Sequence, residues 1–266
     1  MTDIPAGAAP QPRTRTLLAL VLVAQVPIML LAGYLSTRNV PLVGLWAVVG
    51  ISMLVFLMVL GESKGRIGGI LITRHNVMSL SRFQVIAWTL LICSAFITIA
   101  LARVFAGLPN ALSITIPNEL WQLLGISGAS TIGAAMITQN KTNKTPAPQE
   151  VGRAAAALKA PAPEIAEQAD GLAYANRDPK DARFTDMFEG DEITNAAYID
   201  VSKVQMFFFT LVALISYGAL IAQFMMEKDI KALTAFPEIT SGLVTILGIS
   251  HATYLGTKTV DQTKTA

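Results

Sequence analysis

Six stretches of the chain are long, apolar and free of charged side chains, and this feature limits its possible folds more than any other. A helix needs about 20 apolar residues to cross the ~30 Å hydrocarbon core of a membrane. Inside lipid every backbone polar group must be bonded internally, so only helices and closed barrels span it. The runs are continuous and do not alternate in polarity, which favours helices. The predicted spans are residues 17–37, 40–61, 83–102, 120–140, 204–226 and 239–257.

The composition supports lipid as the solvent of these segments. Apolar residues make up 53% of the 266 residues and charged residues only 14%, whereas soluble domains carry roughly 25% charged residues. This argues against a soluble enzyme, a disordered protein, a collagen and a coiled coil. A net charge of +2 does not favour nucleic-acid binding. One cysteine, Cys93, excludes an internal disulfide and a Cys-rich zinc site.

The fourth and sixth runs are less certain membrane crossings than the others. Residues 120–140 and 239–257 are rich in Gly and Ser, so a re-entrant or interfacial segment is the alternative reading for each. With six spans, the connections after the second and fourth spans lie on the same side as both termini. Of the 20 Lys and Arg residues, 16 fall on that side. The positive-inside rule therefore predicts cytoplasmic termini.

The chain also contains a predicted internal repeat. ITRHNVMSLSRFQ, starting at Ile72, aligns without a gap with ITNAAYIDVSKVQ, starting at Ile193. GISGASTIG, starting at Gly125, aligns with GISHATYLG, starting at Gly248. Each unit reads as a long span followed by a Gly-rich span that returns. Two units in the same orientation predict parallel repeats related by a pseudo-twofold axis along the membrane normal.

We therefore predict an all-α, polytopic membrane helical bundle of six spans with a parallel two-helix repeat. The organisation that follows is an N-terminal cytoplasmic tail (1–16), two transmembrane helices (17–61), repeat unit 1 (72–140), a cytoplasmic Ala/Pro-rich and acidic segment (141–192), repeat unit 2 (193–257) and a C-terminal tail (258–266).

Small residues recur every fourth position in the second span of each unit. This spacing makes a smooth stripe that lets another helix approach closely. The favoured reading is a helix-packing seam; the alternative is a narrow pathway whose hydroxyls face an ion or solute. The residues concerned are Gly125, Ser127, Ala129 and Gly133 in the first unit, and Gly248, Ser250, Ala252 and Gly256 in the second.

A Ser-x-x-Gln pattern begins the first span of each unit. It is typical of a capping box, in which the Ser accepts from the backbone and the Gln reaches back. A basic residue follows each Ser and suits an interface anchor. The predicted caps and anchors are Ser81, Arg82 and Gln84, and Ser202, Lys203 and Gln205.

His251 is the candidate ionisable site. It lies in the predicted last span, where an ionisable side chain is a functional candidate by default. A neutral His bonded to another helix is the structural alternative. No second His or acid is placed to share a metal, and we predict no metal and no cofactor.

Residues 141–203 differ from the rest of the chain. The part from 145 to 163 is rich in Ala and Pro and reads as a linker. RFTDMFEGDEI, from Arg183 to Ile193, reads as a short amphipathic helix that ends at Gly190. Its apolar face would pack on the bundle or dock a soluble partner. Its acids lack the alternation of a calcium loop.

The repeat blocks also show a resemblance. SRFQVIAWTL with LLGISGAS, and SKVQMFFFTL with ILGISHATYLG, resemble a group of bacterial multi-pass membrane proteins of unknown function. The resemblance covers residues 72–139 and 193–257 and implies a bacterial inner membrane. It assigns no catalytic or ligand residue, and His251 stands where that group usually has Gly or Ala.

No Walker A, HExxH or CxxC signature occurs in the sequence. We therefore expect a non-enzymatic anchor or scaffold of a membrane complex. It would contact the lipid bilayer, self-associate, present residues 145–200 to a cytoplasmic protein and bind no nucleic acid. The alternative is an ion channel or small-solute conduit built on the pseudo-twofold repeat.

Overall fold

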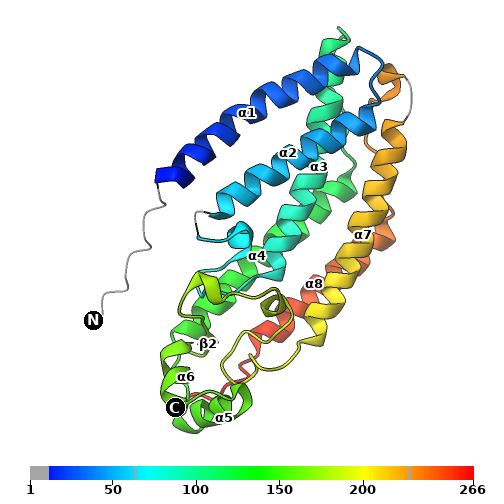
Figure 1. The fold of residues 1–266 in the computed structure, drawn as a ribbon. Helices are drawn as coiled ribbons and strands as arrows, with labels where there is room; N and C mark the ends of the chain where they lie inside the picture. Colours follow the sequence, from blue (N-terminus) through cyan, green and yellow to red (C-terminus); the bar gives the residue numbers. More distant parts are fainter. Residues whose placement is uncertain (1–11, 63, 227–228) are drawn as a thin grey trace.

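The protein is a bundle of long helices with a smaller folded segment at one end (Figure 1). The structure is a computed structural model that describes residues 12–62, 64–226 and 229–266. The long helices are α1 (Pro12–Ser36), α2 (Leu42–Glu62), α3 (Leu80–Phe105), α4 (Asn118–Thr142), α7 (Val201–Met225) and α8 (Ser241–Thr259).

Five of these helices, α1 to α4 and α7, are long and apolar enough to cross a membrane. Their outer faces carry large exposed apolar side chains, such as Leu20, Ile132 and Ile215, each more than 60% exposed. Such surfaces are stable against lipid and unfavourable in water. The chain is therefore a mostly helical membrane protein. The 19-residue α8 is not among the five, so a sixth crossing remains a prediction.

The long helices pack as two groups, α1 with α2 and α8 with α4 and α7, and α3 connects them. Helix α1 lies on α2 and α3, and α3 also contacts α2, α4 and α7, while α8 packs on α4 and α7. The centre is filled by side chains such as Trp88, Tyr217 and Leu120, each at most 1% exposed. Gln25 crosses from α1 to donate to the carbonyl of Ser52 at 2.9 Å. Interhelical hydrogen bonds of this kind contribute about 0.6–2 kcal/mol in a membrane.

Loops close the end of the bundle that is remote from the smaller segment. They follow α3 and α7, and Arg103, buried in the last turn of α3, donates to the carbonyls of Ala111 and Leu233. Thr115 and Ala235 form a parallel bridge there. Both lie shortly before the second helix of a predicted repeat unit, and the repeat itself stays a prediction.

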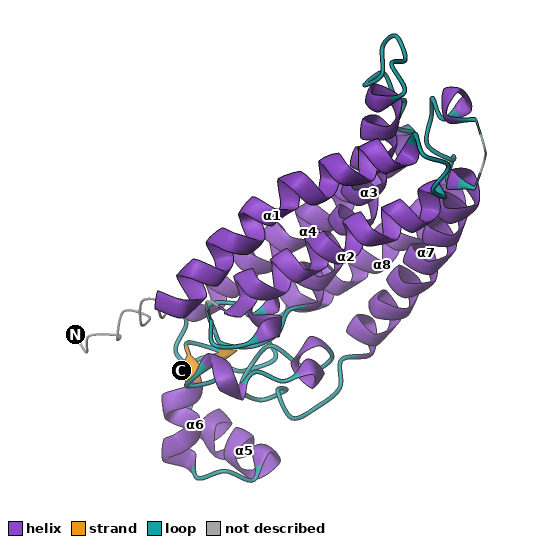
Figure 2. Cartoon of the chain, turned by 45° about the horizontal axis from the view of Figure 1, so that its top comes forward, coloured by secondary structure: helices purple, strands orange, loops and turns teal. Residues whose placement is uncertain are grey.

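The smaller segment, residues 143–200, is called the cap. It is ordered on the bundle end and contains more regular structure than a linker (Figure 2). The linker prediction was wrong, because Pro148 and the alanines after it form a helix, and Ala154 and Ala155 pack on Ile165. Its elements are α5 (Pro148–Leu158), α6 (Ala162–Gln168), the paired strands β1 (Ala169–Asp170) and β2 (Ala173–Tyr174), and the 3₁₀ helices η2 (Pro179–Asp181) and η3 (Phe184–Met187).

The prediction of an amphipathic helix from 183 to 190 was also wrong. Only η3 forms, because Asp186 turns back to accept from the backbone N–H of Arg183, and Gly190 then pairs with Tyr198. A Cβ at Gly190 would lie 2.2 Å from Asn195 Oδ1, so this glycine serves a close approach of two loop strands.

Two further 3₁₀ helices lie in connections between long helices. They are η1 (Ile67–Leu71), between α2 and α3, and η4 (Ile230–Ala232), between α7 and α8. The C-terminal tail, residues 260–266, returns to the cap, where Thr265 bridges Pro146.

Candidate functional site: a cavity beneath the cap

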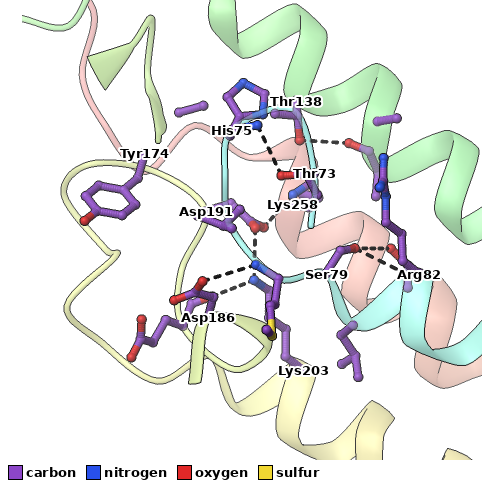
Figure 3. Close-up of a pocket in the computed structure, with 18 of the residues that line it drawn as sticks. Thr73, His75, Ser79, Arg82, Thr138, Tyr174, Asp186, Asp191, Lys203 and Lys258 are labelled. Atoms are coloured by element: carbon purple, nitrogen blue, oxygen red, sulfur yellow. Dashed lines mark hydrogen bonds and ion pairs between the residues drawn. The ribbon is translucent and has the colours of Figure 1, made fainter. Parts of the chain in front are cut away.

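The cap encloses a cavity of about 210 Å³ against the end of the bundle. Its wall combines the loop 73–79, the first turn of α3, the last turns of α4 and α8, the start of α7 and the cap itself. Figure 3 shows these groups converging from segments far apart in the sequence. The volume lies below the ~300–1,000 Å³ of typical drug-sized ligand sites.

Two consecutive acids of the cap pair with three buried lysines, one from each of three bundle helices. Asp191 lies 3.0 Å from the Nζ of Lys203 and 2.5 Å from that of Lys258. Glu192 pairs with Lys141. The three lysine side chains are only 4–6% exposed. The cap therefore sits where it supplies the counter-charges for the ends of α4, α7 and α8.

The second acid also fixes the C-terminal tail. The carboxylate of Glu192 is 1% exposed and accepts backbone N–H groups from Gln262 at 3.0 Å and Thr263 at 2.6 Å. A buried carboxylate is stable only when its oxygens are fully bonded. The tail and Lys141 together meet this requirement.

The charge of Asp191 is set by the same contacts. Burial by itself raises the pKa of its carboxyl group, but the ammonium groups of Lys203 and Lys258 outweigh that effect and hold the pKa well below its ordinary value. The carboxyl group is therefore ionised at neutral pH, and the network carries more positive than negative charge.

A second set of contacts joins the cap to the loop before α3. Asp186 accepts the backbone N–H of Met78 at 3.1 Å. Asn76 and Asn176 each donate a side-chain amide to the other's backbone carbonyl, at distances of 2.8 and 2.9 Å. Burial raises the pKa of Asp186, which the two backbone hydrogen bonds oppose. These bonds fix the side wall of the cavity.

His75 lies in the same wall and is 7% exposed. Its Nε2 is 3.0 Å from Oδ2 of Asp170 in the cap. Burial is the larger effect and lowers the pKa of His75, while the Asp170 carboxylate opposes it. The imidazole is therefore neutral at pH 7.

The helix caps fall two residues earlier than predicted. Ser79 caps α3 and accepts from the N–H of Arg82, while Asp200 caps α7 and accepts from the N–H and hydroxyl of Ser202 at 2.8 and 2.6 Å. A carboxylate accepts more strongly than a hydroxyl, which explains the second shift. Ser81 is buried in the first turn of α3.

The two glutamines of the predicted capping boxes have different environments. Gln84 is fully buried and donates to the hydroxyl of Thr210 on α7 at 2.6 Å, whereas Gln205 is exposed. Arg82 donates to the carbonyl of Ile72 at 2.6 Å and lines the cavity. Lys203, its predicted counterpart, is buried in the ion network.

The predicted small-residue seams lie mostly on the outside of the chain. Gly125 and Ala129 on α4 and Ala252 and Gly256 on α8 are exposed. Two of their glycines meet a neighbouring helix: a Cβ at Gly133 would lie 3.3 Å from Leu255, and one at Gly248 would lie 3.7 Å from Ile126. Ser127, Ser250 and His251 instead face the interior, each less than 5% exposed.

Sequence reasoning missed the ion network. The sequence pattern uses Lys141 and Lys258 only for the orientation of the spans, and it places Asp191 and Glu192 in the amphipathic stretch 183–193 without a partner. The available signal was the pair of adjacent acids in a segment bounded by spans that carry lysines at their ends. Among the described residues no group of three or more His, Cys, Asp and Glu side chains could hold a metal ion.

The arrangement defines a class: a helical membrane protein with a cap fixed by buried ion pairs over a small cavity. Comparisons with protein-family models, with curated proteins and with solved structures found no match to this chain. The resemblance to bacterial multi-pass proteins therefore stays a prediction.

Replacing Asp191 with Asn tests the network. The change leaves Lys203 and Lys258 without their carboxylate, and loss of one partner of a buried pair costs about 3–5 kcal/mol. Folding lowers the pKa of Asp191 below its ordinary value of about 4. Its contribution to the free energy of unfolding is therefore fully present above about pH 4 and is lost as the pH falls below that. Thermal unfolding in detergent at pH 7 should show a clear loss of stability, and proteolysis should cut the cap first.

The matched control is Asp261→Asn. Its partner Lys144 is 40% exposed, so the same change there should cost no more than ~1 kcal/mol. Equal effects of the two variants would contradict the importance of the buried network.

Proposed function

We propose that the protein is a non-enzymatic anchor or scaffold of a membrane complex. The observation that carries this proposal is the buried pairing of Asp191 and Glu192 with lysines from three helices. A cap held in this way keeps one orientation relative to the membrane, which suits the presentation of a surface to another protein. The sequence has no Walker A, HExxH or CxxC signature, which is consistent with this role.

We place the cap in the cytoplasm of a bacterial cell and the helices in its inner membrane. The excess of basic residues on the side of the termini supports this orientation. Arg66, Arg74 and Lys144 lie at the end of the bundle that carries the cap, in agreement with the excess of basic residues on that side. The bacterial inner membrane rests on the resemblance of the repeat blocks.

Self-association through α4 and α8 is part of the proposal. Gly125 and Gly256 have open space where a Cβ would lie, and the exposed Ala129 and Ala252 continue the two stripes. Smooth, small-residue faces support close helix packing in lipid. The predicted pseudo-twofold repeat places one such stripe in each unit.

Large residues on these stripes should block the association without unfolding the chain. We expect Gly125→Leu and Gly256→Leu to shift the protein from oligomer to monomer in energy-transfer or crosslinking measurements in liposomes. Gly44→Leu is the matched control, because that glycine on α2 is also exposed with nothing within 4 Å. An unchanged oligomer in both stripe variants, or a monomeric wild type, would refute this part.

The hairpin of α5 and α6 is the proposed contact for a cytoplasmic protein. It stands at the outer tip of the cap, away from the membrane helices (Figures 1 and 2). Its charged side chains are largely exposed, including Arg153 at 71% and Glu167 at 67%. None of its residues takes part in the ion pairs of Asp191 and Glu192.

Replacing residues 149–167 with a short Gly/Ser linker tests this contact. We expect the variant to lose the proteins that co-purify with the full chain from its native membrane, while insertion and oligomeric state persist. The Arg153→Ala variant serves as a control for nonspecific charge effects. Co-purification of the same proteins with the linker variant would contradict a partner site on this hairpin.

A second candidate is a conduit for ions or small solutes, and the cavity beneath the cap is the observation that favours it. The packed core around Trp88 and Tyr217 argues against an open path through one chain.

Ion flux into liposomes separates the two functions. A scaffold gives flux equal to that of empty vesicles, because its core is closed. A conduit gives flux above that background, and Thr138→Trp, which fills the cavity, should reduce it. Ile132→Trp, on the outer face of the same helix, is the control.

A further inference from the structure

Four polar atoms inside the bundle have no hydrogen-bond partner among the residues that the structure describes. They are Oε1 of Gln84 on α3, Oγ of Ser130 on α4, and Oγ of Ser250 and Nδ1 of His251 on α8. The four residues are 0–4% exposed. An unbonded buried polar group is destabilising, so four of them on three neighbouring helices point to a polar binding site.

The contacts between α4 and α8 place two of these groups opposite each other. Ile126 contacts position 248, and Leu255 contacts position 133, so the helices run side by side in a fixed register. Ser130 lies four residues after Ile126 and three before Gly133, on the same face of α4. His251 lies three residues after Gly248 and four before Leu255, on the corresponding face of α8. Ser130 and His251 therefore share one interface.

Helix periodicity places these groups just behind the cavity wall, which reaches Arg82 on α3, Thr131 on α4 and Tyr254 on α8. Gln84 follows the wall residue Leu80 by four positions, Ser130 precedes the wall residue Ala134 by four, and Ser250 precedes the wall residue Tyr254 by four. Residues four apart lie above one another on a helix, about 6 Å along its axis. The unbonded atoms thus form a layer directly behind the cavity.

An apolar layer closes the other side. One further turn along the three helices lie Trp88, Ile126 and Leu247. Trp88 and Leu247 are 1% exposed, and Ile126 packs against the same core. Solvent that reaches Gln84 and His251 must therefore come from the cavity.

We propose that this layer is a hydrated site: water from the cavity beneath the cap enters the bundle, binds Gln84, Ser130, Ser250 and His251, and stops at Trp88. Water fits because each molecule needs two to four polar partners and can both donate and accept. The cavity has room for several waters, each of which occupies about 30 Å³ in the liquid. The inference does not depend on the scaffold role, because a closed, water-filled recess is compatible with either candidate function.

Radiolytic hydroxyl-radical footprinting of the wild-type protein tests this site. Radicals formed from water bound next to a buried side chain oxidise that side chain. We expect His251 and Tyr254 to be oxidised at rates within tenfold of exposed Tyr198, and Trp88 to remain unmodified although indole is intrinsically more reactive. Oxidation of His251 no faster than that of Trp88 would overturn the proposal.

Variants test the route of the water. Thr138→Trp narrows the cavity and should slow His251 oxidation at least fivefold while Tyr198 is unaffected. Ile132→Trp, on the exposed face of α4, should leave both rates unchanged. If the folded Thr138→Trp protein oxidises His251 at the wild-type rate, the cavity is not the source of the water. If it does not fold, the wild-type footprint alone decides between a hydrated and a dry layer.

Discussion

The structure depends on the burial of three lysine ammonium groups against two adjacent carboxylates. Lys141 and Lys258 lie in the last turns of α4 and α8, and Lys203 lies in the first turn of α7. Asp191 and Glu192 meet them from the cap. A charge removed from water without a partner costs several kcal/mol, so each helix end is stable only where the cap places an acid. The network thereby fixes the cap, the tail and the cavity between them as one arrangement.

Two solvents surround different parts of this chain: lipid surrounds the long helices and water surrounds the cap. Lipid selects the apolar outer faces of α1 to α4 and α7, while water selects the charged outer surface of the cap. Between them lies a zone of buried polar groups: the ion network, the Asn76–Asn176 pair, and the layer of Gln84, Ser130 and His251. Interior polarity is concentrated where the two solvents meet, which is also where the cavity lies.

Much of the helical architecture was predictable, because a charge-free apolar run of 20 residues has few alternatives to a helix in lipid. The helices appear near their predicted positions, and five have the length and apolarity of spans. The cap was poorly predicted. Alanines taken for a linker form α5, and a predicted helix reduces to η3, since backbone bonds from Met78 and Arg183 to Asp186 are not visible in local sequence patterns.

The sequence by itself determined the solvent and the helical class of the protein, because hydrophobicity and length act locally along each segment. Only the tertiary structure decided which helix faces meet, that Gln84 is buried while Gln205 is exposed, and that Asp191 lies between Lys203 and Lys258. These outcomes join residues that are distant in the sequence, such as Gln84 and Thr210, which lie 126 positions apart. Coulomb attraction and hydrogen bonding act over a few ångströms in space, and no local pattern of residues reports which distant groups will come that close.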